Sequence, residues 1–246
     1  MAHWDSQGVV SAADRGLIHA VSSCGFDVIV VTTADCRPGE LSGLLGEGVI
    51  AAGSRDNIGF DFLSWSRGLD AWADLPRLRR LLLLNTSVYG PVRPFGRFLD
   101  RVFDGTTDVV GFTGSRELLP HAQSYALAFG PAAIGSSQFG DYWARVRPSR
   151  AKWGTILGHE LRWQRDLTGP GLRAGVVVPA PPRPVNPLTL HWRDLVEHGF
   201  PFLKKSLFTV NYDDVDMTGW RDQVGIGHPV VEMIEHDLHR LGHPVP

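Results

Sequence analysis

Short, continuously apolar runs alternate with helical patterns along the first third of this chain, and this alternation restricts the fold more than any other feature. The runs are "FDVIVVTT" (26–33), "GVIAAGS" (48–54) and "RLLLL" (80–84). Between them, apolar spacing and helix-start residues indicate helices, one of them from about Phe60. Continuous apolar runs are typical of strands buried on both faces. The order therefore predicts an α/β fold, with helices on both sides of a parallel or mixed sheet.

The rest of the chain continues with both kinds of element. We expect further strands at 107–113, 122–130 and 172–178. We expect helices at 11–25, 70–79, 95–103, 131–143, 149–167 and 229–241.

Composition narrows the class of protein. The chain has 246 residues, 43% hydrophobic and 20% charged, which suits one globular domain over residues 1–246. The formal charge of −2 and the lack of a basic block argue against a nucleic-acid partner. Cys24 and Cys36 form no metal or redox motif, and no apolar run is long enough for a membrane span. A cytoplasmic protein is expected, and association with the inner face of the membrane or with a second copy is left open.

Polar residues follow the leucine strand at Asn85, Thr86 and Ser87. In open α/β sheets, ligands bind outside the carboxyl ends of the strands, so these side chains are candidates for a binding site. They could equally cap the turn, because such residues bond to nearby backbone. They cannot form the carboxylate cage that Mg²⁺ or Mn²⁺ prefers, so no metal site is expected here.

A second polar group, Arg55, Asp56, Asn57 and Asp61, follows the strand at 48–54. An arginine, two carboxylates and an amide can hold the hydroxyls and base edge of a nucleotide. Asp and Asn are also common helix N-caps, and the spacing does not decide between the two interpretations.

Other candidates lie in the second half. Glu160 could act as a general base, although a solvent-facing glutamate is the simpler interpretation of the sequence. Lys204 and Lys205 stand between apolar residues and could neutralise a diphosphate or lie on the surface. The histidines of the tail lack a ligand spacing beyond one i, i+3 pair, so we expect no zinc site.

Read in order, several motifs resemble the rhamnan synthesis protein F family, glycosyltransferases of bacterial surface-polysaccharide assembly. The motifs are "HWD" (3–5), "RDNIGFDFLSW" (55–65), "LLLLNTSVYGPV" (81–92), "DVVGFT" (108–113), "HAQSYALAFG" (121–130), "GHELRWQRDLTGPG" (158–171) and "NPLTLHWRDLVEHGFPFLKKSLF" (186–208). Each motif alone is weakly specific, and their common order carries the resemblance.

The resemblance implies a GT-A-like, Rossmann-type mixed sheet flanked by helices. Residues 1–115 would bind a nucleotide sugar, and residues 116–246 would form a helical acceptor half. The family's first strand precedes the His-x-Asp motif, but only two residues precede His3 here. We therefore expect a truncated first strand, so that the sheet lacks it or another segment or chain fills its place. The implied substrate-binding residues are His3, Asp5, Thr32, Arg55, Asp56, Asn57, Asp61, Asn85, Ser87, His121, Gln123 and His159.

The implied activity is inverting transfer of a sugar, such as the deoxyhexose rhamnose, from a dTDP-, UDP- or GDP-linked donor to a glycan or lipid-linked acceptor. Glu160 matches the position of the base. This chain has Asn85-Thr86-Ser87 where the family usually has Asn-Asp-Ser, so we expect no metal cofactor, with Lys204 and Lys205 as catalytic partners of the diphosphate. Mg²⁺ or Mn²⁺ is the alternative. Competing functions are a non-catalytic sugar-nucleotide or glycan-binding module and a nucleotidyltransferase, although no metal-binding carboxylate pair is evident for the latter.

Overall fold

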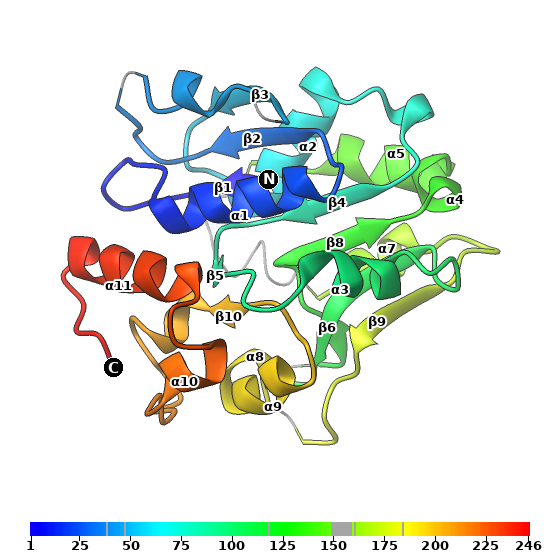
Figure 1. The fold of residues 1–246 in the computed structure, drawn as a ribbon. Helices are drawn as coiled ribbons and strands as arrows, with labels where there is room; N and C mark the ends of the chain where they lie inside the picture. The colour runs from blue at the N-terminus through cyan, green and yellow to red at the C-terminus, as the bar shows by residue number, and fades with distance from the viewer. Residues whose placement is uncertain (38, 47, 118, 149–158, 160, 184) are drawn as a thin grey trace.

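The computed structural model describes residues 1–246 except 38, 47, 118, 149–158, 160 and 184 (Figure 1). The strands are β1 (Ala2–His3), β2 (Val28–Thr32), β3 (Val49–Ser54), β4 (Leu81–Leu84), β5 (Val88–Tyr89), β6 (Val109–Ser115), β7 (His121–Ala122), β8 (Ala126–Phe129), β9 (Ala174–Val178) and β10 (Leu203–Lys204). The α-helices are α1 (Ala12–Ser23), α2 (Phe60–Trp72), α3 (Phe95–Val102), α4 (Pro131–Ile134), α5 (Ser137–Arg145), α7 (Trp163–Leu167), α8 (Pro187–Leu190), α9 (Trp192–Glu197), α10 (Trp220–Val224) and α11 (Pro229–Leu241).

The strands form a mixed sheet, as the apolar runs predict. β1, β2 and β3 are parallel, with β2 in the middle. A parallel bridge between Ala2 and Asn85 joins β1 to the end of β4. β4 and β6 each pair antiparallel with β8, and β9 runs parallel to β6 on its other side. The strands β1, β2, β3, β4 and β6 therefore end at the same edge of the sheet.

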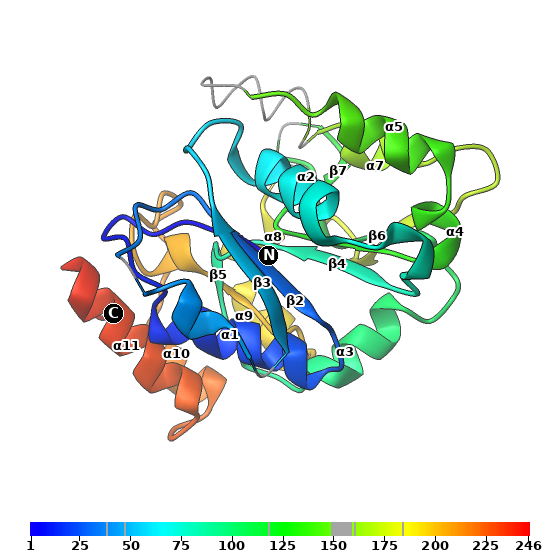
Figure 2. The ribbon, with the colours of Figure 1, turned by 90° about the horizontal axis from the view of Figure 1, so that it is seen from above.

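Helices cover both faces of the sheet. α1 and α3 lie on one face, and α2, α5 and α7 lie on the other (Figure 2). One buried cluster packs α1 and α3 against the first face, and a second packs α2 and α5 against the opposite face. The sheet is thus an internal layer, which explains why its strands are apolar on both sides.

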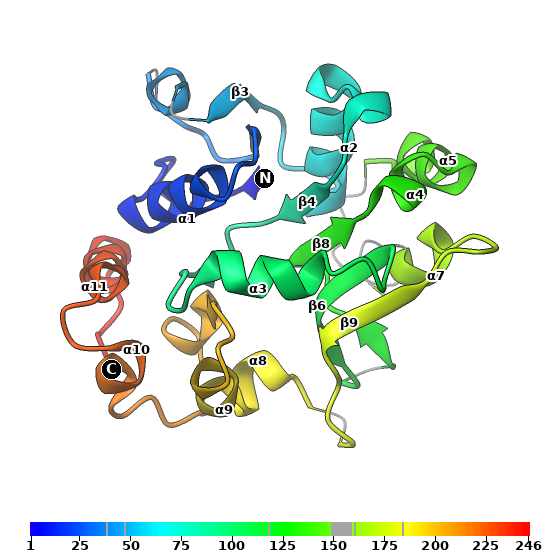
Figure 3. The ribbon, with the colours of Figure 1, turned by 45° about the vertical axis from the view of Figure 1, so that its right-hand side comes forward.

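The helices of the C-terminal part gather away from α4, α5 and α7 (Figure 3). α11 packs beside α1, and a third buried cluster joins it to α9, α10 and the short β5–β10 ladder. No helix in the described part of the chain is both long and apolar enough to cross a membrane.

Several expected elements differ from the observed ones. The helix expected at 70–79 is absent, because α2 ends at Trp72 and Pro76 lies in a 3₁₀ turn over Leu75–Arg77. The strand expected at 122–130 is divided into β7 and β8, since Gln123 bonds back to Thr113.

Two expected helices also differ. The helix at 131–143 is interrupted at Gly135, after which Ser136 caps α5. Of the helix expected at 149–167, Trp163–Leu167 form α7, and residues 149–158 and 160 lie outside the described part.

Candidate functional site

The carboxyl ends of the parallel strands bring together polar side chains from distant parts of the sequence. His3 ends β1, Thr32 ends β2, and Asn85 follows β4. Arg55 follows β3, and its main-chain N–H donates to the Thr32 carbonyl over 3.0 Å. The predicted candidates of the first 90 residues thus share one edge of the sheet.

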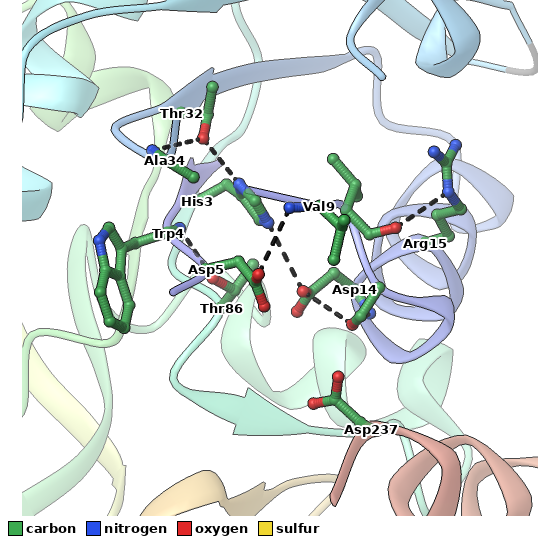
Figure 4. Close-up of polar contacts among 12 residues, drawn as sticks. His3, Trp4, Asp5, Val9, Asp14, Arg15, Thr32, Ala34, Thr86 and Asp237 are labelled. Atoms are coloured by element: carbon green, nitrogen blue, oxygen red, sulfur yellow. Dashed lines mark hydrogen bonds and ion pairs between the residues drawn. The ribbon is translucent and has the colours of Figure 1, made fainter. Parts of the chain in front are cut away.

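His3 and Thr32 meet inside this edge (Figure 4). The Nδ1 atom of His3 and the hydroxyl of Thr32 share a hydrogen bond of 2.8 Å, and Thr32 also accepts from the N–H of Ala34. The other ring nitrogen, Nε2, lies 3.6 Å from a carboxylate oxygen of Asp14. Only 2% of His3 is exposed, so its contacts are internal to the protein.

Asp14 extends this network to Lys205. The Lys205 ammonium donates to Asp14 Oδ1 over 2.8 Å, lies 3.9 Å from Asp237, and sits over the Tyr89 ring at 5.0 Å. Burial by itself would raise the pKa of Asp14, but His3 and the Lys205 charge together lower it to about 2. The Asp14 carboxylate is therefore ionised over the whole physiological range.

The last helix closes the network. Arg240 donates 2.6 Å hydrogen bonds to both Asp5 and Asp237, and the Tyr89 hydroxyl donates to Asp237 over 2.8 Å. Burial, followed by the Asp237 charge, raises the pKa of Tyr89, so the phenol keeps its proton. Asp5 is therefore held by Arg240 of α11.

Asn85, Thr86 and Ser87 form the turn that the strand end predicts. Asn85 Oδ1 accepts from the N–H of Ser87 over 3.1 Å and from its hydroxyl over 2.6 Å. The side-chain amide of Asn85 donates to Asp61 over 2.7 Å. Burial raises the pKa of Asp61, although the Asn85 bond opposes this shift. The turn and the start of α2 are therefore locked together.

Ser87, the last residue of this turn, is exposed, and so is Trp4 beside the turn. The N–H of Trp4 donates to the Thr86 hydroxyl over 3.4 Å, and 54% of Trp4 is exposed. Its indole projects away from His3 and Asp14 (Figure 4).

Arg55 fixes the loop that leads into α2. Its guanidinium donates to Ser64 Oγ and to the carbonyls of Asp56, Ile58 and Phe60. The helix begins after Gly59, whose φ of +74° suits glycine, and no side chain caps it. Neither Asp56 nor Asn57 therefore has the capping role that their residue types allowed.

Two further candidates reach the same edge through β6 and β7. Gln123 accepts from the Thr113 hydroxyl over 2.7 Å and donates to Asn186 over 3.1 Å. His121 is the first residue of β7 and pairs with Ser115 of β6, and its Nδ1 lies 2.7 Å from the Leu119 carbonyl.

Lys204 is placed beside the Asn85 turn by main-chain pairing. β10 is antiparallel to β5, with Lys204 opposite Val88 and the N–H of Lys205 donating to the Ser87 carbonyl. The predicted lysines thus reach the strand end, but Lys205 is directed into the Asp14–Asp237 network.

His159 lies over α2 instead. Its ring stacks on Phe62 at 5.1 Å, and its Nδ1 is 3.3 Å from the Tyr142 hydroxyl. Burial lowers the pKa of His159. Glu160, the predicted base, lies outside the described residues.

Sequence reasoning did not select Asp14, Asp237 or Arg240, which hold His3 and Asp5. The one local signal is Ser11, which caps α1 and bonds to Asp14 three residues later. Among the described residues, no group of three or more His, Cys, Asp or Glu side chains could hold a metal ion.

Comparison with known proteins gives one family and distant relatives. The family described as rhamnan synthesis protein F matches residues 34–237. Uncharacterized protein y4gN of Sinorhizobium fredii is 30% identical over 118 residues, which cover 46% of this chain and 31% of that protein. Virulence protein VirA of Vibrio anguillarum is 27% identical over 193 residues, 64% of this chain and 62% of that protein. The chain spans less than two thirds of either relative.

Proposed function

This chain belongs to the rhamnan synthesis protein F family, and from that premise we propose that it is a GT-A-like glycosyltransferase of polysaccharide synthesis. It would transfer a sugar, such as a deoxyhexose, from a nucleoside-diphosphate donor to a hydroxyl of a glycan or lipid-linked acceptor. The observation that carries the proposal is the convergence of polar side chains and of Lys204 at the edge where the parallel strands end.

The donor would lie along this edge. Asn57, in the loop before α2, and Ser87, in the turn after β4, would face its ribose and diphosphate, and Asp61 would hold the turn through Asn85. Trp4 supplies an exposed ring beside the turn. Because His3, Thr32 and Asp5 are held internally, their role would be to shape this edge more than to contact the nucleotide.

The chemical step breaks the bond between the sugar and the diphosphate, and negative charge accumulates on the leaving group. A fixed positive charge near that group lowers the barrier. We assign this role to Lys204, beside the Asn85 turn, and we assign Lys205 to positioning. Glu160 would take the proton from the acceptor hydroxyl as it attacks the anomeric carbon with inversion.

The residues of the same turn bear on whether the enzyme needs a metal. Asn85, Thr86 and Ser87 offer an amide and two hydroxyls, which are poor substitutes for carboxylates as Mg²⁺ ligands. The Asn85 oxygen is already bonded to Ser87, and its nitrogen to Asp61. We therefore propose turnover without a divalent metal.

The test is release of nucleoside diphosphate from a panel of UDP-, dTDP- and GDP-sugars, with excess EDTA or with added Mg²⁺ or Mn²⁺. We expect equal turnover in both conditions, and Glu160→Gln should lose turnover while keeping donor binding. Activity lost in EDTA and restored by metal would overturn metal independence. Donor binding without turnover under every condition would favour the alternative, a non-catalytic sugar-nucleotide or glycan-binding module.

A further inference from the structure

Trp4 is exposed although both of its neighbours in the sequence are buried. The exposed fraction is 54% for Trp4, compared with 2% for His3 and 8% for Asp5. Among the described residues, the indole has no ring contact and no hydrogen bond, and only the main-chain N–H of Trp4 is bonded, to Thr86. A single exposed aromatic residue is common on protein surfaces and by itself needs no explanation. Trp4 differs from such a residue in how it is held and where it lies.

The main chain is fixed on both sides of Trp4. Before it, the His3 carbonyl accepts from the N–H of Thr33 over 2.9 Å. After it, Arg240 binds both carboxylate oxygens of Asp5. An aromatic side chain on such a fixed main chain loses little conformational entropy when it binds a ligand, because few torsions remain free. The Trp4 indole is therefore preorganised for contact with a ligand.

The indole lies on the side of the sheet that α2 covers. Side chains alternate between the two faces of an extended strand. His3 is directed to Asp14 of α1, whereas Ala2 packs with Phe62 of α2 in the second buried cluster. Trp4 comes two residues after Ala2 and should share its face. Figure 4 agrees, since the indole projects away from Asp14.

The turn after β4 separates Trp4 from the lysine that we assign to the diphosphate. On one side, the Thr86 hydroxyl accepts from the N–H of Trp4. On the other side, the Ser87 carbonyl accepts from the N–H of Lys205, which places Lys204 next to the turn. In an inverting transfer, the acceptor hydroxyl attacks the sugar from the side opposite to the leaving group. With the diphosphate at Lys204, the acceptor would approach over Trp4.

The chemistry of an indole suits one part of a glycan. The ring is flat and apolar, and its faces carry partial negative charge. A pyranose ring has C–H groups on its faces and hydroxyl groups around its rim. Its apolar face can therefore cover the indole while the hydroxyl groups keep their hydrogen bonds.

A nucleobase also stacks on aromatic rings, but the order of the strands places it elsewhere. In the proposed function the ribose lies near Asn57, after β3, and β2 and β1 stand between β3 and the turn after β4. The base end of the donor would thus lie away from Trp4. We propose that the Trp4 indole binds the acceptor by stacking on one pyranose ring of a glycan. This inference rests on the proposed function, whose acceptor is a glycan or lipid-linked hydroxyl.

The experiment follows the indole N–H signals of the isotope-labelled 246-residue chain by NMR. The chain has eight tryptophans, and the Trp4 signal is the one that Trp4→Phe removes. The probes are the methyl glycosides of rhamnose, glucose, galactose and N-acetylglucosamine. The sugar alcohols rhamnitol and glucitol are the controls, because they keep the hydroxyl groups but have no ring.

We expect at least one glycoside to shift the Trp4 signal saturably, with a Kd of about 1–10 mM for a ligand of about a dozen non-hydrogen atoms. Read from the ligand signals, Trp4→Ala should weaken this binding at least about tenfold, and Trp4→Phe should keep part of it. Trp72→Ala removes an exposed tryptophan at the other edge and should leave the affinity unchanged. UDP, dTDP and GDP should not displace the glycoside.

Four results would overturn the proposal. They are the absence of a saturable shift with every glycoside, equal affinity of Trp4→Ala, equal binding of the sugar alcohols, and displacement of the glycoside by a nucleoside diphosphate. The third result would exclude stacking on a ring, and the fourth would assign the indole to the nucleotide.

The proposed function can fail separately, because glycoside binding is measured without turnover. If the chain transfers sugar, Trp4→Ala should raise the KM of the acceptor at least about tenfold and change kcat by less than about threefold. An unchanged acceptor KM would overturn the role of Trp4 and leave the proposed function in place. Glycoside binding at Trp4 in a chain that transfers no sugar would overturn the proposed function and keep the glycan contact.

Discussion

The two edges of the sheet satisfy their polar groups in opposite ways. At the carboxyl edge, side chains from α1, from α11 and from the turn after β10 bind one another, so that the buried carboxylates of Asp14 and Asp237 are paired with Lys205. At the amino edge, a cavity of about 750 Å³ opens between β2 and β4, and most of the residues that line it are apolar. The first edge is held together by ion pairs, whereas the second is lined mainly by apolar side chains.

This difference bears on function and stability. Buried ion networks are sensitive to the loss of a single member, because the remaining charge is left without a partner. Residues that line an open cavity are incompletely packed, so substituting one of them should lower the free energy of unfolding less. The following predictions test the contrast.

The largest expected effect is on stability at the carboxyl edge. Lys205→Ala leaves the buried Asp14 carboxylate without its lysine, whereas Asp237 keeps Arg240, and we expect the free energy of unfolding to fall by about 3–5 kcal/mol. Chemical denaturation checks this value. Arg97→Ala, at an exposed position of α3, is the control for loss of a positive charge and should cost about 1 kcal/mol or less. Equal losses for the two variants would contradict the network.

The next effect is on catalysis. Lys204→Ala should lower turnover of the donor by about 100- to 1,000-fold, because the leaving diphosphate would lose its positive partner. Steady-state kinetics on folded Lys204→Ala protein measures this loss directly, and Lys204→Arg should recover part of it. Unchanged turnover would remove Lys204 from the proposed mechanism.

Lowering the pH should reduce the free energy of unfolding through protonation of Asp14. Its pKa of about 2 in the folded protein lies below the ordinary value of 3.8, so its contribution is complete above pH 4 and is lost as the pH falls toward 2. At about 1.4 kcal/mol per pH unit, the contribution is about 2 kcal/mol. Between pH 6 and pH 2, the free energy of unfolding should therefore fall more steeply for the native chain than for Asp14→Asn. Parallel curves would show that Asp14 titrates normally.

The smallest effect is expected at the amino edge. Trp72 is 43% exposed, lines the cavity at the amino edge and lies against Gly53. Trp72→Ala should cost about 1 kcal/mol, measured by denaturation. Trp4→Ala, at the other edge, is the exposed control and should cost less. If Trp72→Ala lowered the free energy of unfolding by about 3 kcal/mol or more, this side of the cavity would be part of the folded core.

The sequence predicts elements well where one local pattern is strong. The helix expected at 229–241 has the observed bounds of α11, and the apolar runs at 26–33, 48–54 and 80–84 contain β2, β3 and β4. Prediction is weaker where long-range pairing decides. β5 and β10 have two residues each, and each exists because the other lies opposite it.

The candidate site shows the same division. Its position after the strands could be predicted, because apolar runs followed by polar residues mark strand ends. The partners of His3 and Asp5 could not, since Asp5 and Arg240 are 235 positions apart and ordinary spacing rules do not reach that far. The side-chain pairing of Lys205 was equally hidden, because nothing local distinguishes it from Lys204.

The bond between Asp5 and Arg240 has a consequence for synthesis of the protein. A ribosome makes residue 5 long before residue 240, so the first motif emerges into water with its guanidinium partner still untranslated. The early chain can form α1 and pair β2 with β3, but Asp5 and Asp237 gain their shared cation only after α11 has left the exit tunnel. Arg240, translated 235 residues after Asp5, thus holds the turn at Asp5 in place.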